Sequence, residues 1–372
     1  MKIATIIGAR PQLIKAAAVS RAIAVHNRLT PNALRLTEII IHTGQHYDEG
    51  MSAIFFRELE IPEPVYNIGI GSGSHGKQTG DMLAAIEKLL IAEKPDWVLV
   101  YGDTNSTLAG ALAAAKLHIP VAHVEAGLRS FNRRMPEEIN RVITDHLSTL
   151  LFCPSQVSVD NLTIEGIANG ITIVGDVMAD ALQFAAAKVS TNSDILKHLD
   201  IQPNGYLMAT VHRAENTDDP DCLINIMAAL SELAEREVVV LPLHPRTKKI
   251  LENTFPALLA PDHSCLTPNT SLQIIDPLGY FDTIALEKSA RMILTDSGGM
   301  QKEAYWLKVP CITLRDETEW VETVETGWNI LTGADHKKII NAIHNFTQPT
   351  EHPSLYGDGH AAEKITKIIC YR

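Results

Sequence analysis

The chain has 372 residues, which is enough for two domains at roughly 100 to 200 residues each. Its 32 Lys and Arg against 44 Asp and Glu give a formal net charge of −12, which argues against a general nucleic-acid or anionic-membrane binder because the long-range field repels phosphate. A hydrophobic content of 45%, with 22 Gly and 19 Pro, is typical of a globular protein and excludes disorder and collagen-like repeats.

The sequence gives no indication of a membrane segment, a signal peptide or a disulfide framework. No stretch approaches the roughly 18 to 20 uncharged apolar residues of a membrane helix, and the N-terminus leads into a predicted strand without a signal-peptide cleavage site. The five cysteines are scattered and include no Cys-x-x-Cys pair, which is typical of reduced thiols and not of disulfides or a zinc site. The sequence predicts a cytoplasmic protein with no membrane segment.

Short apolar, β-branched runs alternate with helical patterns along the first half of the chain. The predicted strands are 3–7, 38–43, 97–101, 121–124, 150–153 and 171–174. The predicted helices between them are 12–25, 78–92, 106–116 and 136–147. Because such strands are too apolar for a sheet with one wet face, the pattern predicts a parallel sheet covered by helices.

A second, similar set of elements follows. Its predicted strands are 206–210, 238–241, 271–275, 292–295, 311–314 and 329–331, and a last helix is predicted near 358–371. Two successive sets of six strands imply two α/β domains, 1–175 and 176–357, joined near 175–182 and packed around a cleft. Ligands bind at the carboxyl ends of strands in open parallel sheets, so polar residues are most informative there.

Two strand ends carry signals for anion binding. Arg10 and Lys15 lie near the start of the first predicted helix, where free N–H groups and the helix dipole favour an anion. Taken alone, each of the two would be explained more simply as a solvated basic side chain. Ser297, Gly298 and Gly299 precede another helix and permit close backbone approach to a ligand. With Glu303 placed to accept ribose hydroxyls and Arg315 as a further cation, the second group indicates a nucleoside diphosphate.

The carboxylates give the sharpest chemical signal. Asp103 and Glu125 end neighbouring predicted strands in mostly apolar surroundings, where burial and mutual repulsion would raise a pKa as acid–base chemistry requires. Glu137 and Glu138 open a helix, and Glu138 is explained by the helix dipole alone. His212 follows a strand of the second domain and would face these acids, although a lone strand-end histidine is more often structural.

Two other ligand classes receive little support. The 15 histidines include no His-Glu-x-x-His motif and no Cys/His set, which argues against a metal. Residues 71–76 match Gly-x-Gly-x-x-Gly, but the preceding residues 62–67 make a poor strand and no acid follows at the spacing of a dinucleotide site. A flexible loop explains residues 71–76 better than an NAD site.

Taken in order, these motifs resemble those of the non-hydrolysing UDP-N-acetylglucosamine 2-epimerase family. The matching motifs are Ile7-Gly8-Ala9-Arg10-Pro11, Tyr101-Gly102-Asp103-Thr104, His123-Val124-Glu125-Ala126-Gly127-Leu128-Arg129, Pro136-Glu137-Glu138-Ile139-Asn140-Arg141, Val211-His212-Arg213 and Thr295-Asp296-Ser297-Gly298-Gly299. The resemblance runs nearly end to end.

The resemblance implies two Rossmann-like domains in the glycosyltransferase-B arrangement, with the active site in the interdomain cleft and a helix at 358–372 packing back on the first domain. It implies a cytoplasmic homodimer that uses no cofactor and no metal. It further implies catalytic roles for Asp103, Glu125, Glu137 and His212. The implied UDP-binding residues are Arg10, Lys15, Leu278, Tyr280, Ser297, Gly298, Gly299, Glu303 and Arg315.

The implied reaction interconverts UDP-GlcNAc and UDP-ManNAc and supplies surface polysaccharide synthesis such as that of lipopolysaccharide O-antigen. The C2 proton of a glycosyl phosphate has no adjacent carbonyl, so direct abstraction is very hard. Loss of UDP to give a 2-acetamidoglycal, followed by re-addition with a proton on the opposite face, avoids this problem. The route needs tight diphosphate binding, carboxylates for proton transfer, and exclusion of water.

Several departures from the family pattern leave the substrate open. Gln12 replaces a common Glu, and residues 130–135 lack the common Ser-Pro-Trp. The latter resemble the branch acting on UDP-2,3-diacetamido-2,3-dideoxy-glucuronic acid, where Arg133 or Arg134 could pair with the C6 carboxylate, although solvated arginines are the alternative. The two substrates are about equally supported.

Regulation and alternative activities also remain open. Gln45, His46 and His244 match positions that hold an activating second substrate molecule in bacterial members, but the acidic residues 48–49 that follow put this role in doubt. A glycosyltransferase on the same fold would need an acceptor and would not explain the three acids Asp103, Glu125 and Glu137. A catalytically dead sensor would have no reason to bury them.

Overall fold

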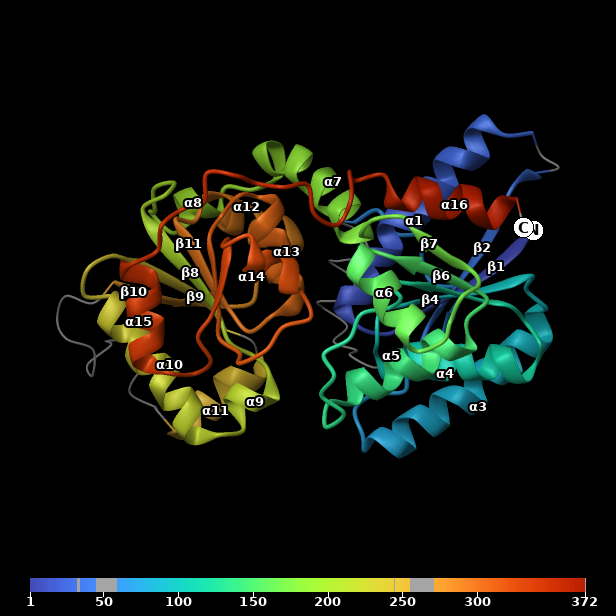
Figure 1. Cartoon of the computed structure of the whole chain (residues 1–372), viewed down its shortest axis with the longest axis horizontal. Coiled ribbons are helices and arrows are strands. Elements are labelled where there is room, and N and C mark those ends of the chain that lie inside the picture. Colours follow the sequence, from blue (N-terminus) through green and yellow to red (C-terminus); the bar gives the residue numbers. More distant parts are fainter. Residues whose placement is uncertain (32–33, 45–58, 244, 255–270, 372) are drawn as a thin grey trace. The chain divides into compact units, whose positions relative to one another are not determined.

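The computed structural model describes residues 1–31, 34–44, 59–243, 245–254 and 271–371, and it divides into two units. Unit 1 comprises Met1–Phe184 and Tyr356–Arg372, and unit 2 comprises Ala185–Leu355. The division falls within helix α7, Val177–Asn192. Each unit is a parallel sheet flanked by helices (Figure 1), which confirms the α/β class predicted from the sequence.

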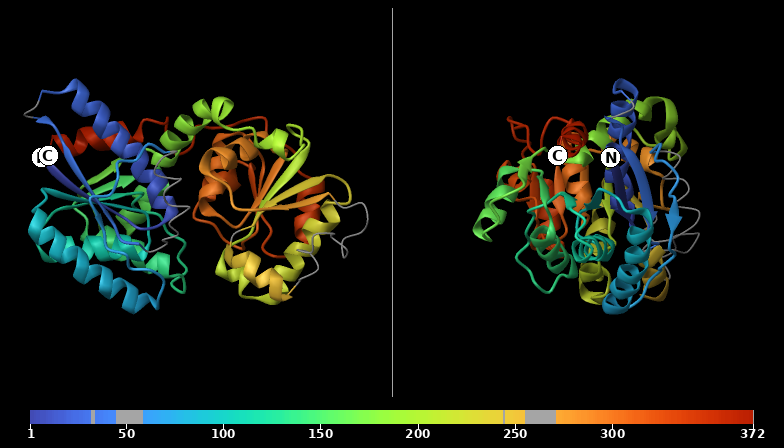
Figure 2. Two further views of the ribbon diagram at one scale, coloured as in Figure 1. Left: turned by 180° about the vertical axis from the view of Figure 1, so that it is seen from behind. Right: turned by 90° about the vertical axis from the view of Figure 1, so that its right-hand side faces the viewer.

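Unit 1 contains a seven-stranded parallel sheet in the order β3-β2-β1-β4-β5-β6-β7. Its strands are β1 Lys2–Ile7, β2 Thr37–His42, β3 Tyr66–Asn67, β4 Trp97–Tyr101, β5 Val121–Val124, β6 Leu150–Cys153 and β7 Ile171–Ile173. Its other helices are α1 Arg10–Leu29, α3 His75–Glu93, α4 Asn105–Lys116, α5 Pro136–Leu147, α6 Gln156–Ile164 and α16 Ala361–Cys370. Helices α1 and α16 cover one face of the sheet, and α3 and α4 cover the other (Figure 2).

The expectation of six strands in this sheet is wrong, because β3 adds a seventh. This strand has two residues, paired as Ile41 with Tyr66 and His42 with Asn67, and it is too short to produce a hydrophobic run. The Gly-rich residues 71–76 therefore follow an edge strand. They do not follow β1, which lies next to the point where the strand order reverses and where such sheets bind dinucleotides.

Unit 2 contains a six-stranded parallel sheet in the order β10-β9-β8-β11-β12-β13. Its strands are β8 Tyr206–Thr210, β9 Val238–Pro242, β10 Leu272–Ile275, β11 Met292–Thr295, β12 Cys311–Thr313 and β13 Asn329–Leu331. Its helices are α8 Ile195–His198, α9 Ala214–Thr217, α10 Pro220–Leu233, α11 Pro245–Thr254, α12 Tyr280–Ser289, α13 Gly298–Trp306, α14 Val321–Glu325 and α15 His336–His344.

Alternation along β8 explains why both faces of the second sheet are covered. Leu207 and Ala209 are buried in a cluster that includes residues of α10 and α15. Tyr206 and Met208 are buried in a second cluster with residues of α12 and α13. Successive side chains of a strand point to opposite faces, so a strand that is apolar at every position requires helices on both sides.

The strand order reverses once in each sheet, between β1 and β4 in unit 1 and between β8 and β11 in unit 2. The connections that leave these neighbouring strands run in opposite directions, which opens a crevice at the carboxyl ends of the strands. The sequence places Asp103 after β4 and His212 after β8. The topology therefore brings these two predicted residues to the ligand-binding edge of their respective sheets.

The C-terminal helix α16 packs against α1 of unit 1, as Figure 1 shows at the blue and red ends of the chain. Asp180 of α7 accepts hydrogen bonds from the first backbone N–H groups of α16, those of Ala361 at 3.1 Å and Ala362 at 2.9 Å. Ile365 and Ile369 are buried on its inner face. Across the described ranges, no helix combines the length and apolar character needed to cross a bilayer.

Two glycines meet where the chain returns to unit 1. Gly175 and Gly357 both have positive φ, and a Cβ added at Gly357 would lie 2.8 Å from Gly175 Cα. The adjacent backbone bond from Asp176 N to Tyr356 O is 2.7 Å long. Close approach of two backbones therefore excludes a side chain at this crossing.

Replacing Gly357 by alanine is expected to destabilise unit 1 by about 1–3 kcal/mol, since it adds both a left-handed non-glycine residue and a backbone clash. Thermal unfolding measures the loss. Gly166→Ala is the matched control, because Gly166 also has positive φ but has open space around its Cβ position. Equal losses in the two variants would show that the contact with Gly175 does not matter.

Candidate active site

Asp103 lies at the switch point of unit 1, two residues after the end of β4. Its side chain keeps 31% of its surface exposed, and its Oδ2 pairs with Nη2 of Arg141 in α5 at 2.7 Å. Burial raises the pKa of Asp103 above its ordinary value, while the charges of Arg141 and Lys15 oppose the rise. A carboxyl group whose pKa moves toward neutrality is better suited to general acid–base chemistry.

Glu125 follows the next strand, β5, and has an unusual backbone conformation. Its φ is +74°, in the left-handed region that non-glycine residues seldom adopt. The carboxylate forms a buried ion pair with Nζ of Lys15 in α1. Gly102 lies against this pair, because a Cβ added there would be 3.2 Å from both charged groups. The turn therefore uses a glycine to make room for the Lys15–Glu125 contact.

These two ion pairs correct one expectation. The sequence predicted mostly apolar surroundings for Asp103 and Glu125, but each carboxylate faces a cation supplied by a helix, Arg141 or Lys15. Both cations are distant in sequence from their partners, so neither pairing has a local signal. The predicted contact of Lys15 with a diphosphate stays a prediction, and in the structure its ammonium group contacts Glu125.

Glu137 and Glu138 occupy the first turn of α5, as predicted. Glu137 is half-buried, and Glu138 is buried. The carboxylate of Glu138 accepts hydrogen bonds from the backbone N–H groups of Ser130 at 2.9 Å and Phe131 at 3.0 Å. Explaining Glu138 by the helix dipole alone is therefore wrong, because its carboxylate also fixes the loop that precedes α5.

Two amide side chains that the sequence did not single out as site residues fix the switch point of unit 1. Gln12 donates to Tyr101 O at 3.0 Å and accepts from Gly8 N at 2.8 Å, so it ties the turn after β1 to the end of β4. A glutamate at this position could not donate the first of these bonds. Asn140 donates to Asp103 O at 2.9 Å and so holds the backbone of the acid.

His212 lies at the switch point of unit 2 and pairs with a buried carboxylate. Its Nδ1 is 2.9 Å from Oδ1 of Asp296, which follows β11 and is fully buried. Asp296 also accepts from the backbone N–H groups of His212 at 2.9 Å and Arg213 at 2.9 Å. Burial alone would raise the pKa of Asp296, but its hydrogen bonds and the charge of His212 hold that pKa below the ordinary value. An ionised Asp296 therefore fixes Nδ1 of His212 as a donor and sets the orientation of the ring.

The residues after Asp296 form the start of helix α13. Ser297 caps the helix by accepting from Met300 N at 3.5 Å, and Gly298 and Gly299 are its first two residues. A Cβ added at Gly298 would lie 3.4 Å from Nε1 of Trp320 and 3.7 Å from Nη2 of Arg213. The carboxylate of Glu319 also lies near, at 4.0 Å from the same point. The first N–H groups of a helix, with a guanidinium nearby, suit an anion such as a diphosphate.

Other predicted UDP-binding residues surround α13. Glu303 is buried in this helix, and one of its carboxylate oxygens lies 3.3 Å from the hydroxyl of Tyr280, which is itself buried. Arg315 follows β12 and donates to the carboxylate of Glu319 at 3.1 Å, so its charge already has a partner. Leu278 is half-buried just before α12.

A family model described as UDP-N-acetylglucosamine 2-epimerase matches residues 29–370. The chain belongs to the UDP-N-acetylglucosamine 2-epimerase family. It is 54% identical over 373 residues to the "UDP-N-acetylglucosamine 2-epimerase homolog" of Methanococcus maripaludis, with 99% of each chain covered. It is 49% identical over 375 residues to the "UDP-2,3-diacetamido-2,3-dideoxy-D-glucuronate 2-epimerase" of Pseudomonas aeruginosa, again with 99% of each covered.

Solved structures give the same family assignment. The UDP-GlcNAc 2-epimerase of Methanocaldococcus jannaschii, in complex with UDP-GlcNAc and UDP, matches with a TM-score of 0.90 and 46% identity over 100% of both chains. The UDP-GlcNAc 2-epimerase of Neisseria meningitidis bound to UDP-GlcNAc matches with a TM-score of 0.86 and 31% identity over 100% of both chains. The family resemblance seen in the sequence is confirmed.

In this UDP-N-acetylglucosamine 2-epimerase family member, some predicted residues lie outside the described residues. Gln45, His46 and His244 belong to this group, as does the side chain of Arg10, whose backbone begins α1. Arg133 is exposed in the loop before α5, and so is the neighbouring Arg134. A regulatory role for the first three residues and substrate contacts for the arginines stay predictions.

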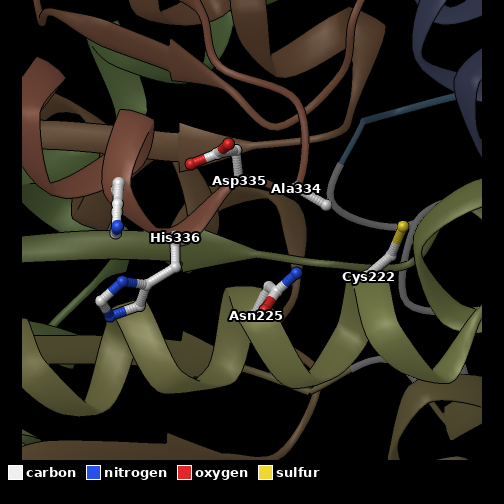
Figure 3. Close-up of a pocket in the computed structure, with 6 residues that line it drawn as sticks. Cys222, Asn225, Ala334, Asp335 and His336 are labelled. Atoms are coloured by element: carbon white, nitrogen blue, oxygen red, sulfur yellow. The ribbon is translucent and has the colours of Figure 1, made fainter.

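Figure 3 shows a hollow beside α10 and α15 that contains none of the predicted site residues. It measures about 640 Å³ and is lined by Cys222, Asn225, Ala334, Asp335, His336 and Lys337. Asp335 is engaged there as the N-cap of α15, accepting from Lys338 N at 2.9 Å. The candidate site residues of this family member lie instead at the switch point of each unit.

Proposed function

We propose that the chain catalyses non-hydrolysing C2 epimerisation of a UDP-2-acetamido sugar, with UDP-GlcNAc and UDP-ManNAc as the substrate pair. The observation that carries the proposal is the chemistry of the two switch points in a member of this family. Unit 1 supplies the carboxylates Asp103 and Glu125, and unit 2 supplies the paired His212 and the open start of α13. Relatives named UDP-N-acetylglucosamine 2-epimerase support the substrate class.

The proposed chemistry assigns a task to each group. The N–H groups at the start of α13 hold the diphosphate and stabilise the charge that builds up as the C1–O bond breaks. Proton removal from C2 then yields a 2-acetamidoglycal and free UDP. UDP re-adds to C1 as a proton arrives on the opposite face of C2. Asp103, Glu125 and Glu137 provide the proton transfers and stabilise the oxocarbenium character, and His212, oriented by Asp296, takes part through its imidazole ring.

A second candidate substrate is UDP-2,3-diacetamido-2,3-dideoxy-glucuronic acid, with the same inversion at C2. The P. aeruginosa relative that carries this activity in its name is 49% identical over nearly the whole chain. The loop that Glu138 holds presents Arg133 and Arg134 as exposed cations. A guanidinium group could bind the C6 carboxylate that distinguishes this sugar.

Proton NMR in D2O tests both candidates on the purified protein. Deuterium at C2 together with a gluco/manno mixture is expected for at least one of the two UDP-sugars, and the faster one identifies the substrate. Binding of UDP without exchange into either sugar would contradict the epimerase proposal and favour a glycosyltransferase. The proposal includes a cytoplasmic homodimer, for which light scattering should give twice the mass of 40.8 kDa.

Replacing Glu303 by glutamine is expected to weaken UDP binding about 10- to 100-fold, because one charge-assisted hydrogen bond to a ribose hydroxyl contributes about 1.5–3 kcal/mol. Isothermal titration calorimetry with UDP measures the change. Glu325→Gln, an exposed carboxylate in the same unit, serves as the control. An unchanged UDP affinity in Glu303→Gln would reject the proposed nucleotide position.

A further inference from the structure

His123 occupies the interior of β5, two residues before Glu125, and it is 0% exposed. Its Nδ1 lies 2.7 Å from Oδ1 of Asp145 in α5. Its Nε2 lies 2.7 Å from the carbonyl oxygen of Gly102, which follows β4. Neither His123 nor Asp145 was singled out as a site residue from the sequence, and the mechanism above does not use them.

The partners of His123 determine its charge. A carbonyl oxygen can only accept, so Nε2 must carry a proton. Asp145 accepts from Arg129 at 2.7 Å and from Gly127 N at 3.1 Å through its other oxygen, and an ionised carboxylate accepts at both. Nδ1 of His123 therefore also carries a proton, and the ring is an imidazolium in a buried pair with Asp145.

The charges around this buried pair balance. Arg129 makes a bidentate contact with Glu165, with both N–O distances 2.7 Å. The surface residue His146 contacts the same carboxylate, with its Nε2 3.4 Å from Oε2 of Glu165. Burial, with the charge of Asp145, raises the pKa of Cys153 to about 12, so this neighbouring thiol stays neutral. Two cations and two carboxylates thus neutralise one another, which makes a charged histidine tolerable inside the protein.

The buried pair joins two turns that carry proposed catalytic acids. His123 holds the carbonyl of Gly102, and the next residue is Asp103. Asp145 holds the N–H of Gly127, which closes the turn begun by Glu125. Glu125 itself is a non-glycine residue with a φ of +74°, and such a backbone conformation persists only where surrounding contacts fix it.

We propose that the His123–Asp145 pair is a positioning device that fixes Asp103 and Glu125 relative to one another for proton transfer. The imidazolium holds one turn, the carboxylate holds the other, and their mutual attraction sets the distance between them. The assignment of proton transfer to the two acids rests on the proposed function. The charge state of His123 and its hold on the two turns do not.

The first measurement is ¹⁵N NMR of the histidine rings in the full-length wild-type protein. Both ring nitrogens of His123 are expected to show imidazolium shifts at pH 7, because each of them faces an oxygen that accepts a hydrogen bond. Asp145→Asn, which preserves shape and removes the charge, is expected to convert the ring to a neutral form. A neutral His123 in the wild-type protein at pH 7 would overturn the proposal.

The second measurement separates positioning from stability. In Asp145→Asn, kcat for C2 exchange is expected to fall about 100-fold through misplaced acids, with KM changed less than about threefold. His123→Gln should give a similar loss, and the double variant should be no worse than either single one, as expected for a coupled pair. Asp180→Asn, a matched substitution of the α7 carboxylate that caps α16 in the same unit, should leave kcat unchanged.

The outcomes distinguish this proposal from the proposed function. An active wild type whose Asp145→Asn variant keeps kcat within twofold would overturn the positioning role alone. A wild type that exchanges neither UDP-sugar would overturn the proposed function. In that case amide hydrogen exchange at Asp103 and Gly127 decides the positioning claim. The variant measured is Asp145→Asn or, if that variant does not fold, His123→Gln. Faster exchange than in wild type at both amides supports the claim, and unchanged exchange rejects it.

Discussion

Replacing Asp103 by asparagine is expected to lower kcat for epimerisation by about 10²–10⁴ while leaving UDP binding intact, because the change removes a proposed proton-transfer group without altering its size. Unit 2, which carries the start of α13, is untouched by the substitution. Deuterium exchange at C2 measures the rate, and calorimetry with UDP measures the affinity. Asp81→Asn, which removes the exposed carboxylate paired with Lys77, is the control and should behave as wild type.

The pH dependence of stability gives an independent check on Asp103. Its pKa is raised in the folded state, so its protonated form is favoured by folding. The contribution to stability is present below the unfolded pKa of about 3.9 and is lost as pH rises through the folded value. Wild type should therefore lose stability relative to Asp103→Asn in thermal unfolding as the pH rises above about 4. In the C2 exchange assay described above, near-wild-type turnover of Asp103→Asn would show that Asp103 is not catalytic.

Replacing His212 by alanine is expected to lower kcat by about 10²–10⁴ as well, again with UDP binding largely retained. Asp296→Asn should reproduce much of this loss, because an amide cannot hold the Nδ1 proton as the carboxylate does. His198→Ala, an exposed histidine of unit 2, is the control. Full activity in both His212→Ala and Asp296→Asn would remove the pair from the mechanism.

Asp296 predicts the opposite pH trend to Asp103. Its pKa is lowered by its hydrogen bonds and by His212, so its contribution to stability is present above the unfolded pKa and is lost as pH falls through the folded value. The stability difference between wild type and Asp296→Asn should therefore be large at pH 7 and shrink in acid. Thermal unfolding at both pH values measures it.

Much of this architecture could be predicted because local hydrophobic patterns decide it. The strands β4, β5 and β11 begin and end at the predicted residues, since each is a short apolar run bounded by polar residues. Strand β3 could not be found, because two residues at an edge leave no pattern to detect. The positions of Asp103 and His212 followed from the rule that parallel sheets bind ligands at the carboxyl ends of their strands.

The partners of the site residues could not be predicted in the same way. The pair of Lys15 and Glu125 spans 110 positions, and the pair of His212 and Asp296 spans 84. Such contacts depend on strand order and on helix orientation, which a single sequence does not encode locally. One feature of the sequence could have indicated Asp296 as a partner of His212. This residue immediately precedes Ser297 and follows β11, the strand that lies next to β8.

The return of the chain to unit 1 has a consequence for synthesis on the ribosome. Unit 2 is one continuous segment, whereas unit 1 needs residues on both sides of it. The helix that packs on α1, with Ile365 and Ile369 buried, is translated after all of unit 2. Because domains generally fold as units while the chain emerges, unit 2 can complete its core first. The unit that carries the carboxylates therefore cannot finish folding until α16 has been translated, after all of unit 2.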